Sequence, residues 1–167
     1  MGEAAVAQGV ADGAILIPSQ HTPGDTSVKQ LVESGFPLVL LDRSIPDVPT
    51  VTVTTQNAKG MAALCESCVT AGCDFLVIHV DDINEVTHTR LQGAIKWCKA
   101  NNVNFVVDDG AIQIPEGVKE IGIVSNAHFE VMKIVRDNPQ WLKDYTIRFG
   151  VFDGWPGAPY PLAEGFV

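Results

Sequence analysis

Polar and aromatic side chains of the kind that binds small hydroxylated molecules follow the apolar runs of this sequence. They include Ser19, Gln20, Asn126, Asp153 and Trp155, and also Arg90, further along the chain after Asp81 and Asp82. Guanidinium, amide and carboxylate groups can bind neighbouring hydroxyls in pairs, and an indole offers a flat apolar face to a sugar ring. The set therefore predicts a binding site for a small polar ligand.

Arg90 stands in an unusual place for a cation. The stretch "THTRLQGAI" (87–95) is typical of a helix start with a threonine cap, which puts Arg90 in the first turn. The helix dipole disfavours a cation there by about 0.3–1 kcal/mol. Either Arg90 is a solvated charge that tolerates this cost, or a charge-assisted hydrogen bond to a ligand offsets it.

A catalytic interpretation rests on acidic residues that follow apolar runs. Asp42, Asp81 and Asp82 could hold Mg²⁺ in a metal-dependent α/β enzyme. The chain has no glycine-rich phosphate motif and no GxSxG elbow. No general base is identifiable for Ser19, and His79, inside an apolar run, is typical of a satisfied core residue. We therefore expect no catalytic residue, no cofactor and no bound metal.

The cysteines favour a reducing compartment. "CESC" places Cys65 and Cys68 late in a predicted helix, whereas a redox pair normally starts one. Cys73 and Cys98 do not supply the second pair that a zinc site would need. Buried, reduced thiols are expected, as in a cytoplasmic protein.

Charge and hydropathy exclude several classes of partner. The 167 residues include 11 Lys and Arg against 20 Asp and Glu, a net charge of −9, so the chain by itself is a poor nucleic-acid or membrane binder. No apolar run approaches the roughly 18 residues of a membrane span, and the first residues do not resemble a secretory signal.

The elements that must position these residues alternate regularly. Apolar runs predict strands at 13–18, 37–42, 50–55, 74–80, 104–108, 120–125 and 145–153, and amphipathic stretches predict helices at 25–35, 57–72, 87–102 and 126–138. Strands that are apolar throughout, each followed by a helix, indicate a doubly wound parallel α/β fold. In such sheets ligands bind beyond the carboxyl ends of the strands.

Several stretches, in this order, resemble one protein family. They are "ADGAILIPS", "LVESGFPLVLLDRS", "VTVTTQNAKGMAAL", "AGCDFLVIHV", "THTRLQGAIKW", "IVSNAHFEVM" and "FGVFDGW". Over residues 11–155 the chain is similar to the effector-binding domain of lactose-repressor-type (LacI/GalR) transcription regulators, which have the periplasmic-binding-protein type I fold.

The resemblance implies a function and site residues. A small effector, most often a sugar, would lie between two α/β lobes, with Arg90, Asn126 and Asp153 as effector contacts. Ser19 and Gln20 match positions that face the ligand from the first lobe. DNA would be contacted only through a domain outside this chain, and a homodimer is expected.

The chain also departs from the family pattern. The connection between the strands at 104–108 and 120–125 is short, and the opening strands of the first lobe are missing. We expect an incomplete first lobe at 1–80, a shortened second lobe at 81–155, and a tail or interlobe crossing at 156–167. A dimerising remnant without ligand binding, the metal-dependent enzyme and a solute-binding protein remain alternatives, although an exported protein would need a signal and would not suit free cysteines.

Overall fold

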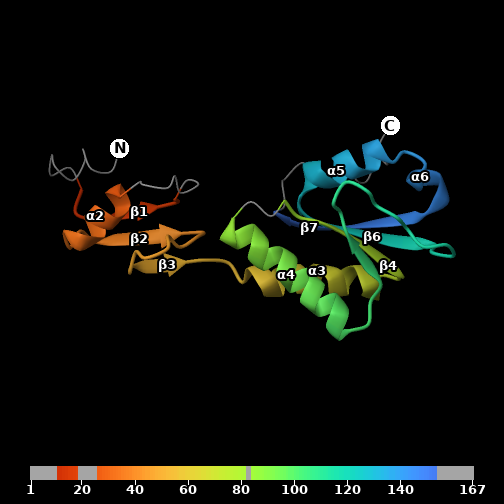
Figure 1. Cartoon of the computed structure of the whole chain (residues 1–167), viewed down its shortest axis with the longest axis horizontal. Helices are drawn as coiled ribbons and strands as arrows, with labels where there is room; N and C mark the ends of the chain where they lie inside the picture. The colour runs from red at the N-terminus through yellow and green to blue at the C-terminus, as the bar shows by residue number, and fades with distance from the viewer. Residues whose placement is uncertain (1–10, 19–25, 82–83, 154–167) are drawn as a thin grey trace. The chain divides into compact units, whose positions relative to one another are not determined.

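The computed structural model describes residues 11–18, 26–81 and 84–153 (Figure 1). The chain divides into two compact units, residues 1–55 and 56–167. Each unit contains its own parallel sheet, and each is described by itself below.

The described residues of the first unit form a small three-stranded sheet and one helix. Its strands are β1 (Ala14–Leu16), β2 (Leu38–Leu41) and β3 (Val51–Val53), parallel and in the order β1-β2-β3, and its helix is α2 (Ser27–Glu33). Leu38 and Leu40 are buried, and Val28 and Val32 of α2 pack against them. Within the described part of this unit, five large apolar side chains are exposed: Ile15, Ile17, Leu41, Val51 and Val53.

The second unit is a four-stranded parallel sheet with helices on both faces (Figure 1). The strands are β4 (Phe75–His79), β5 (Phe105–Val107), β6 (Glu120–Ala127) and β7 (Thr146–Asp153), in the order β5-β4-β6-β7. Helices α3 (Asn57–Thr70) and α4 (Glu85–Ala100) cover one face, and α5 (His128–Asp137) and α6 (Trp141–Asp144) cover the other.

Strand β4 shows why the strands of this sheet appear in the sequence as continuous apolar runs. Leu76 and Ile78 belong to the core under α3 and α4, whereas Phe75 and Val77 belong to the core under α5 and α6. Both faces of the strand are buried, so there is no polar face to produce alternation. The predicted doubly wound parallel α/β fold is confirmed.

The boundary between the units differs from the predicted lobe boundary at residue 80. Residues 56–80, with α3 and β4, belong to the second unit. The physical reason is packing: α3 contributes Met61, Cys65 and Cys68 to the same core as Leu91 of α4. Burial of that shared apolar surface joins α3 to α4 rather than to the first sheet.

The short connection between β5 and β6 contains no helix within residues 108–119, all of which the structure describes. It carries the chain from one side of β4 to the other. Ile112, Ile114 and Val118 pack against the core under α5 and α6. Three apolar side chains of a loop thus cover sheet surface that a crossover helix would otherwise cover.

All four cysteines are buried and free, as the sequence predicted. The Cys98 thiol on α4 forms a hydrogen bond with Cys65 on α3, and this contact together with burial raises the pKa of Cys65. Burial and the neighbouring Cys73 raise the pKa of the Cys68 thiol to about 12. These thiols therefore act as packing groups.

Among the described residues, no helix combines the length and the apolar character that a membrane span requires.

Candidate functional site

Buried polar side chains mark one region of the second unit. Among the described residues, the buried polar or charged ones are Asn57, Arg90, Ser125, Asn126 and Glu130. Asn57 begins α3, Arg90 lies on α4, Ser125 and Asn126 end β6, and Glu130 lies in the first turn of α5. Since buried polar groups cost free energy unless they are paired, this concentration at one edge of the sheet points to a site.

Arg90 is the centre of this group. Its Nε–H donates to Oδ1 of Asn57 at 2.9 Å, and its Nη1–H donates to Oδ2 of Asp153 at 2.7 Å. A longer contact of 3.4 Å joins Nη1 to Oδ1 of Asn126. The guanidinium carbon lies 3.9 Å from the centre of the Phe152 ring, a cation–π contact. The cation is thus held by four residues from three elements.

The two charged side chains of this ion pair, Arg90 and Asp153, are buried to different degrees. The side chain of Arg90 is 7% exposed, whereas that of Asp153 is 62% exposed. The carboxylate therefore reaches solvent while it orients the buried guanidinium. A guanidinium has five N–H donors, and the hydrogen bonds among the described residues use Nε and Nη1. This arrangement can bind a hydroxyl pair or an anionic group of a ligand at the remaining donors.

The start of α4 corrects the expectation that placed Arg90 in the first turn. The N-cap is Asn84, whose Oδ1 accepts from the backbone N–H groups of Val86 and Thr87. Thr87 completes a capping box, since its hydroxyl accepts from the N–H of Asn84. Arg90 therefore lies in the second turn, where the dipole effect is small. The predicted electrostatic penalty does not apply.

Close packing of α3 against α4 brings Asn57 within reach of Arg90. At Gly93, a Cβ atom would lie 2.4 Å from the carbonyl oxygen of Ala58, so only glycine permits this approach. At Gly60 of α3, a Cβ atom would lie 2.4 Å from the ring of Phe152, so glycine leaves room for the ring that contacts the guanidinium. Two glycines thus leave the space in which these side chains pack around Arg90.

The structure brings three predicted site residues together and leaves three outside its description. Arg90, Asn126 and Asp153 are in mutual contact through the guanidinium. Ser19, Gln20 and Trp155 lie outside the described residues. The prediction of the site as a whole therefore remains a prediction.

Sequence reasoning missed Asn57 and Phe152. Asn57 follows the predicted strand at 50–55, so the rule that ligand contacts follow strands could have found it. Phe152 directly precedes Asp153 and reads as an ordinary strand residue, so no sequence signal marks it.

The described acidic residues of the enzyme alternative belong to different units of the chain. Asp42 belongs to the first unit, where its Oδ2 accepts from the guanidinium of Arg43 at 2.8 Å. Asp81 follows β4 in the second unit, and Asp82 lies outside the described residues.

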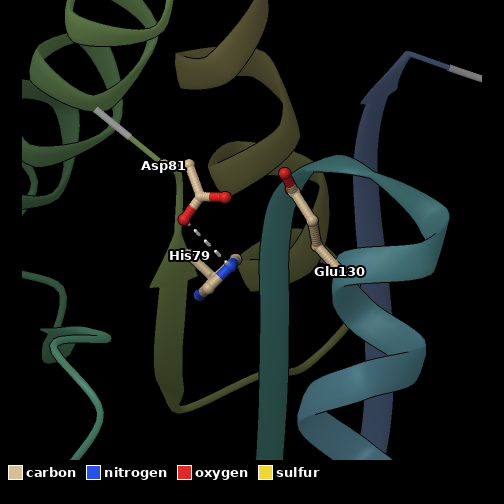
Figure 2. A group of neighbouring side chains, drawn as sticks. All are labelled: His79, Asp81 and Glu130. Atoms are coloured by element: carbon tan, nitrogen blue, oxygen red, sulfur yellow. Dashed lines mark ion pairs between the residues drawn. The ribbon is translucent and has the colours of Figure 1, made fainter. Parts of the chain in front are cut away.

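His79, at the end of β4, is surrounded by carboxylates. Its Nδ1 lies 2.8 Å from Oδ2 of Asp108. Its Nε2 lies 3.8 Å from Oδ1 of Asp81, the ion pair that the dashed line marks in Figure 2. Glu130 is the third carboxylate near His79. Its Oε2 accepts from the Ser125 hydroxyl and from the N–H of Ala127. The sequence predicted a satisfied core residue at this position, whereas the structure places His79 half-buried at the carboxyl edge of the sheet, with the hydrogen bond to Asp108 at Nδ1.

Solved structures share this fold. A regulatory protein of the LacI family from Chloroflexus aggregans is 18% identical over 97% of this chain and 64% of its own, with a TM-score of 0.70. A LacI-family sugar-binding transcriptional regulator from Escherichia coli, complexed with phosphate, is 13% identical over 96% and 65%, with a TM-score of 0.64. The Cra transcriptional dual regulator from Pseudomonas putida, in complex with fructose 1-phosphate, is 15% identical over 93% and 62%, with a TM-score of 0.64.

These similarities establish the fold. The chain spans less than two thirds of the length of each of these three structures. No model of a known protein family matches the sequence, and no curated protein matches it. The fold expected from the resemblance to LacI-type regulators is confirmed, and the three structures described above are named as regulators.

Proposed function

We propose that this chain is the effector-sensing part of a bacterial transcription regulator and binds a small polar molecule, most simply a sugar or sugar phosphate, without chemical conversion. The observation that carries the proposal is the buried guanidinium of Arg90, held by Asn57, Asn126 and Asp153 at the carboxyl edge of the sheet. A rigidly oriented fork of donors suits vicinal hydroxyls and phosphate oxygens.

The chemistry of the contacts supports recognition rather than catalysis. Asn126 and Asp153 supply acceptors beside the donors of Arg90, and the Phe152 ring makes a cation–π contact with the guanidinium. Polyol binding needs such mixed donor and acceptor groups in fixed positions. Ser19, Gln20 and Trp155 are proposed as further ligand contacts, as the sequence suggested.

The solved structures add support of a coarser kind. One of them is named as a sugar-binding regulator and another holds fructose 1-phosphate. A sensor of this fold would couple ligand binding to a change in DNA affinity through a partner domain beyond these 167 residues. We include in the proposal that the chain acts in the cytoplasm as a homodimer.

The proposal is tested by thermal unfolding against a panel of sugars, sugar phosphates and nucleobases. A ligand at 100 times its Kd should stabilise the native state by about 2.7 kcal/mol, which raises the unfolding midpoint by several degrees. Isothermal titration calorimetry with the active compound then gives stoichiometry and Kd. We expect one binding site per chain.

Two variants and a control connect the result to the site. Arg90→Ala should abolish the thermal shift, and Asp153→Asn, at an exposed carboxylate, should weaken binding without unfolding the chain. Arg136→Ala removes an exposed arginine of α5 and should leave binding unchanged. A chain that melts cooperatively but responds to no compound, or a shift that persists in both site variants, would refute the proposal.

A further inference from the structure

We propose that the second unit binds one divalent transition-metal ion, Zn²⁺ or Mn²⁺, through His79, Asp81 and Glu130, with Asp108 orienting the imidazole. One ligand atom from each of the three residues lies within 4.8 Å of the others (Figure 2). Arg90 is not among these ligands, so the inference stands independently of the proposed function.

The spacing of the ligand atoms is close to that of a bound site. Metal–ligand bonds of about 2.0–2.2 Å in tetrahedral geometry place ligand atoms about 3.4 Å apart. Nε2 of His79 already lies 3.8 Å from Oδ1 of Asp81. The side chain of Asp81 is 66% exposed and follows the last residues of β4, so a small rotation can close the remaining gap. The same exposure gives an ion a path from solvent.

The imidazole is oriented as metal-binding histidines usually are. An ionised carboxylate only accepts hydrogen bonds, so Nδ1–H of His79 donates across the 2.8 Å contact to Asp108, and a neutral imidazole with this contact carries its lone pair on Nε2. The lone pair of Nε2 is then directed away from Asp108 and toward the side of Asp81. Asp108 is itself held, since its other oxygen accepts from the N–H of Gly110 at 2.8 Å. Carboxylate–histidine–metal arrangements use this second-sphere contact to fix tautomer and ring orientation.

Glu130 is a pre-positioned carboxylate rather than a free one. It is 8% exposed, and its Oε2 accepts from the Ser125 hydroxyl and the Ala127 N–H. A carboxylate offers about four acceptor positions, so two hydrogen bonds leave lone pairs for a metal. Because Ser125 is paired with His79 in the β4–β6 register, strand pairing and the start of α5 bring the two ligands together.

Charge and ligand type select the class of ion. Three carboxylates surround one imidazole, so the ionised group keeps a net charge of about −2 even when His79 is protonated. One nitrogen and two oxygen donors suit Zn²⁺ or Mn²⁺, whereas Mg²⁺ and Ca²⁺ prefer oxygen alone. Three protein ligands leave further positions for water.

The test uses the full chain after treatment with a chelator. Zn²⁺ and Mn²⁺ are titrated by calorimetry and by competition with a chromogenic chelator, and Co²⁺ is added as a spectroscopic probe. We expect one ion per chain and visible Co²⁺ bands of nitrogen and oxygen ligation, without the near-ultraviolet charge-transfer band of thiolate ligation. That band would assign the ion to the cysteines and overturn the proposal.

Variants separate a built site from surface binding. We expect His79→Gln to lose at least 100-fold in affinity, and Asp108→Asn, outside the coordination sphere, to lose about 10–100-fold. Asp81→Asn changes an exposed side chain and keeps the test valid if His79→Gln does not fold. His88→Gln is the matched control, because this histidine is exposed on α4. Wild-type affinity in His79→Gln or in Asp81→Asn, or no stoichiometric binding of Zn²⁺ or Mn²⁺ by the wild type, refutes the proposal.

Discussion

The packing of α3 against α4 at Gly93 gives a prediction that can be worked out from the structure. In Gly93→Ala, the new Cβ would lie 2.4 Å from the carbonyl oxygen, 2.5 Å from Cα and 2.8 Å from the carbonyl carbon of Ala58. Ordinary contact begins at 3.4 Å, so the two helices must separate by roughly 1 Å. All three atoms are backbone, so no side chain can turn away to relieve the clash.

The magnitude follows from two opposing effects. Overpacking a well-packed contact costs about 1–3 kcal/mol, and here the cost should lie at the upper end because a helix must move. Alanine gains about 1 kcal/mol over glycine in helix propensity. We expect the free energy of unfolding to fall by about 2 kcal/mol, which lowers the unfolding midpoint by about 4–8 °C in a domain of this size.

The assay is urea unfolding followed by tryptophan emission. All three tryptophans, Trp97, Trp141 and Trp155, belong to residues 56–167, so this signal reports the second unit. Gln92→Ala is the matched control, since Gln92 is exposed on the same helix and its replacement should change stability by less than about 0.5 kcal/mol. If Gly93→Ala is as stable as the wild type or more so, the helices do not approach as closely as the structure shows. Separation should also weaken the contact between Arg90 and Asn57, so ligand affinity should fall with stability.

Two further predictions concern the same unit. Asn84→Ala removes the side-chain cap of α4 and should lower the free energy of unfolding, measured by urea unfolding, by about 1 kcal/mol. An unchanged urea midpoint would show that the cap does not stabilise the start of the helix. The pKa of the Cys68 thiol is about 12 in the folded chain, against an ordinary value of 9.0. The unfolded chain therefore loses the thiol proton at a lower pH than the folded chain does. The contribution of Cys68 to the free energy of unfolding is present below pH 9 and is lost as the pH rises toward 12. Urea midpoints at pH 7.5, 9 and 10 should fall more steeply in the wild type than in Cys68→Ala, and parallel curves would contradict this.

Local pattern predicted the order of the strands and of helices α2 to α5, and placed their bounds within about two residues of the observed ones. The predicted strand at 145–153 is β7 (Thr146–Asp153), and the predicted helix at 57–72 is α3 (Asn57–Thr70). The strand prediction is correct because a strand buried on both faces must be apolar throughout. The helix prediction is correct because Gly72, with φ +106°, ends α3. The short helix α6 was not predicted, since four residues carry no helical period.

The start of α4 shows where local pattern was insufficient. The stretch "THTRLQGAI" predicted a threonine cap, whereas Asn84, three residues before Thr87, is also of a residue type that caps helices well. The capping box uses both, with Asn84 as the cap, and this choice shifts Arg90 by one turn. The electrostatic problem that drew attention to Arg90 disappears, while its burial against Asn57 and Asp153 gives a stronger reason to propose a binding role.

The sequence by itself determined a parallel α/β fold and the residues that end its strands, because apolar periodicity and turn residues act over short distances. Arg90, Asn126 and Asp153 could therefore be named as neighbours at one sheet edge. Only the tertiary structure decided that Asn57 and Phe152 complete the environment of Arg90, and that His79 meets Asp81, Asp108 and Glu130. Those contacts depend on how closely two helices approach and on which residues pair across strands, and both are set by packing between segments far apart in the chain.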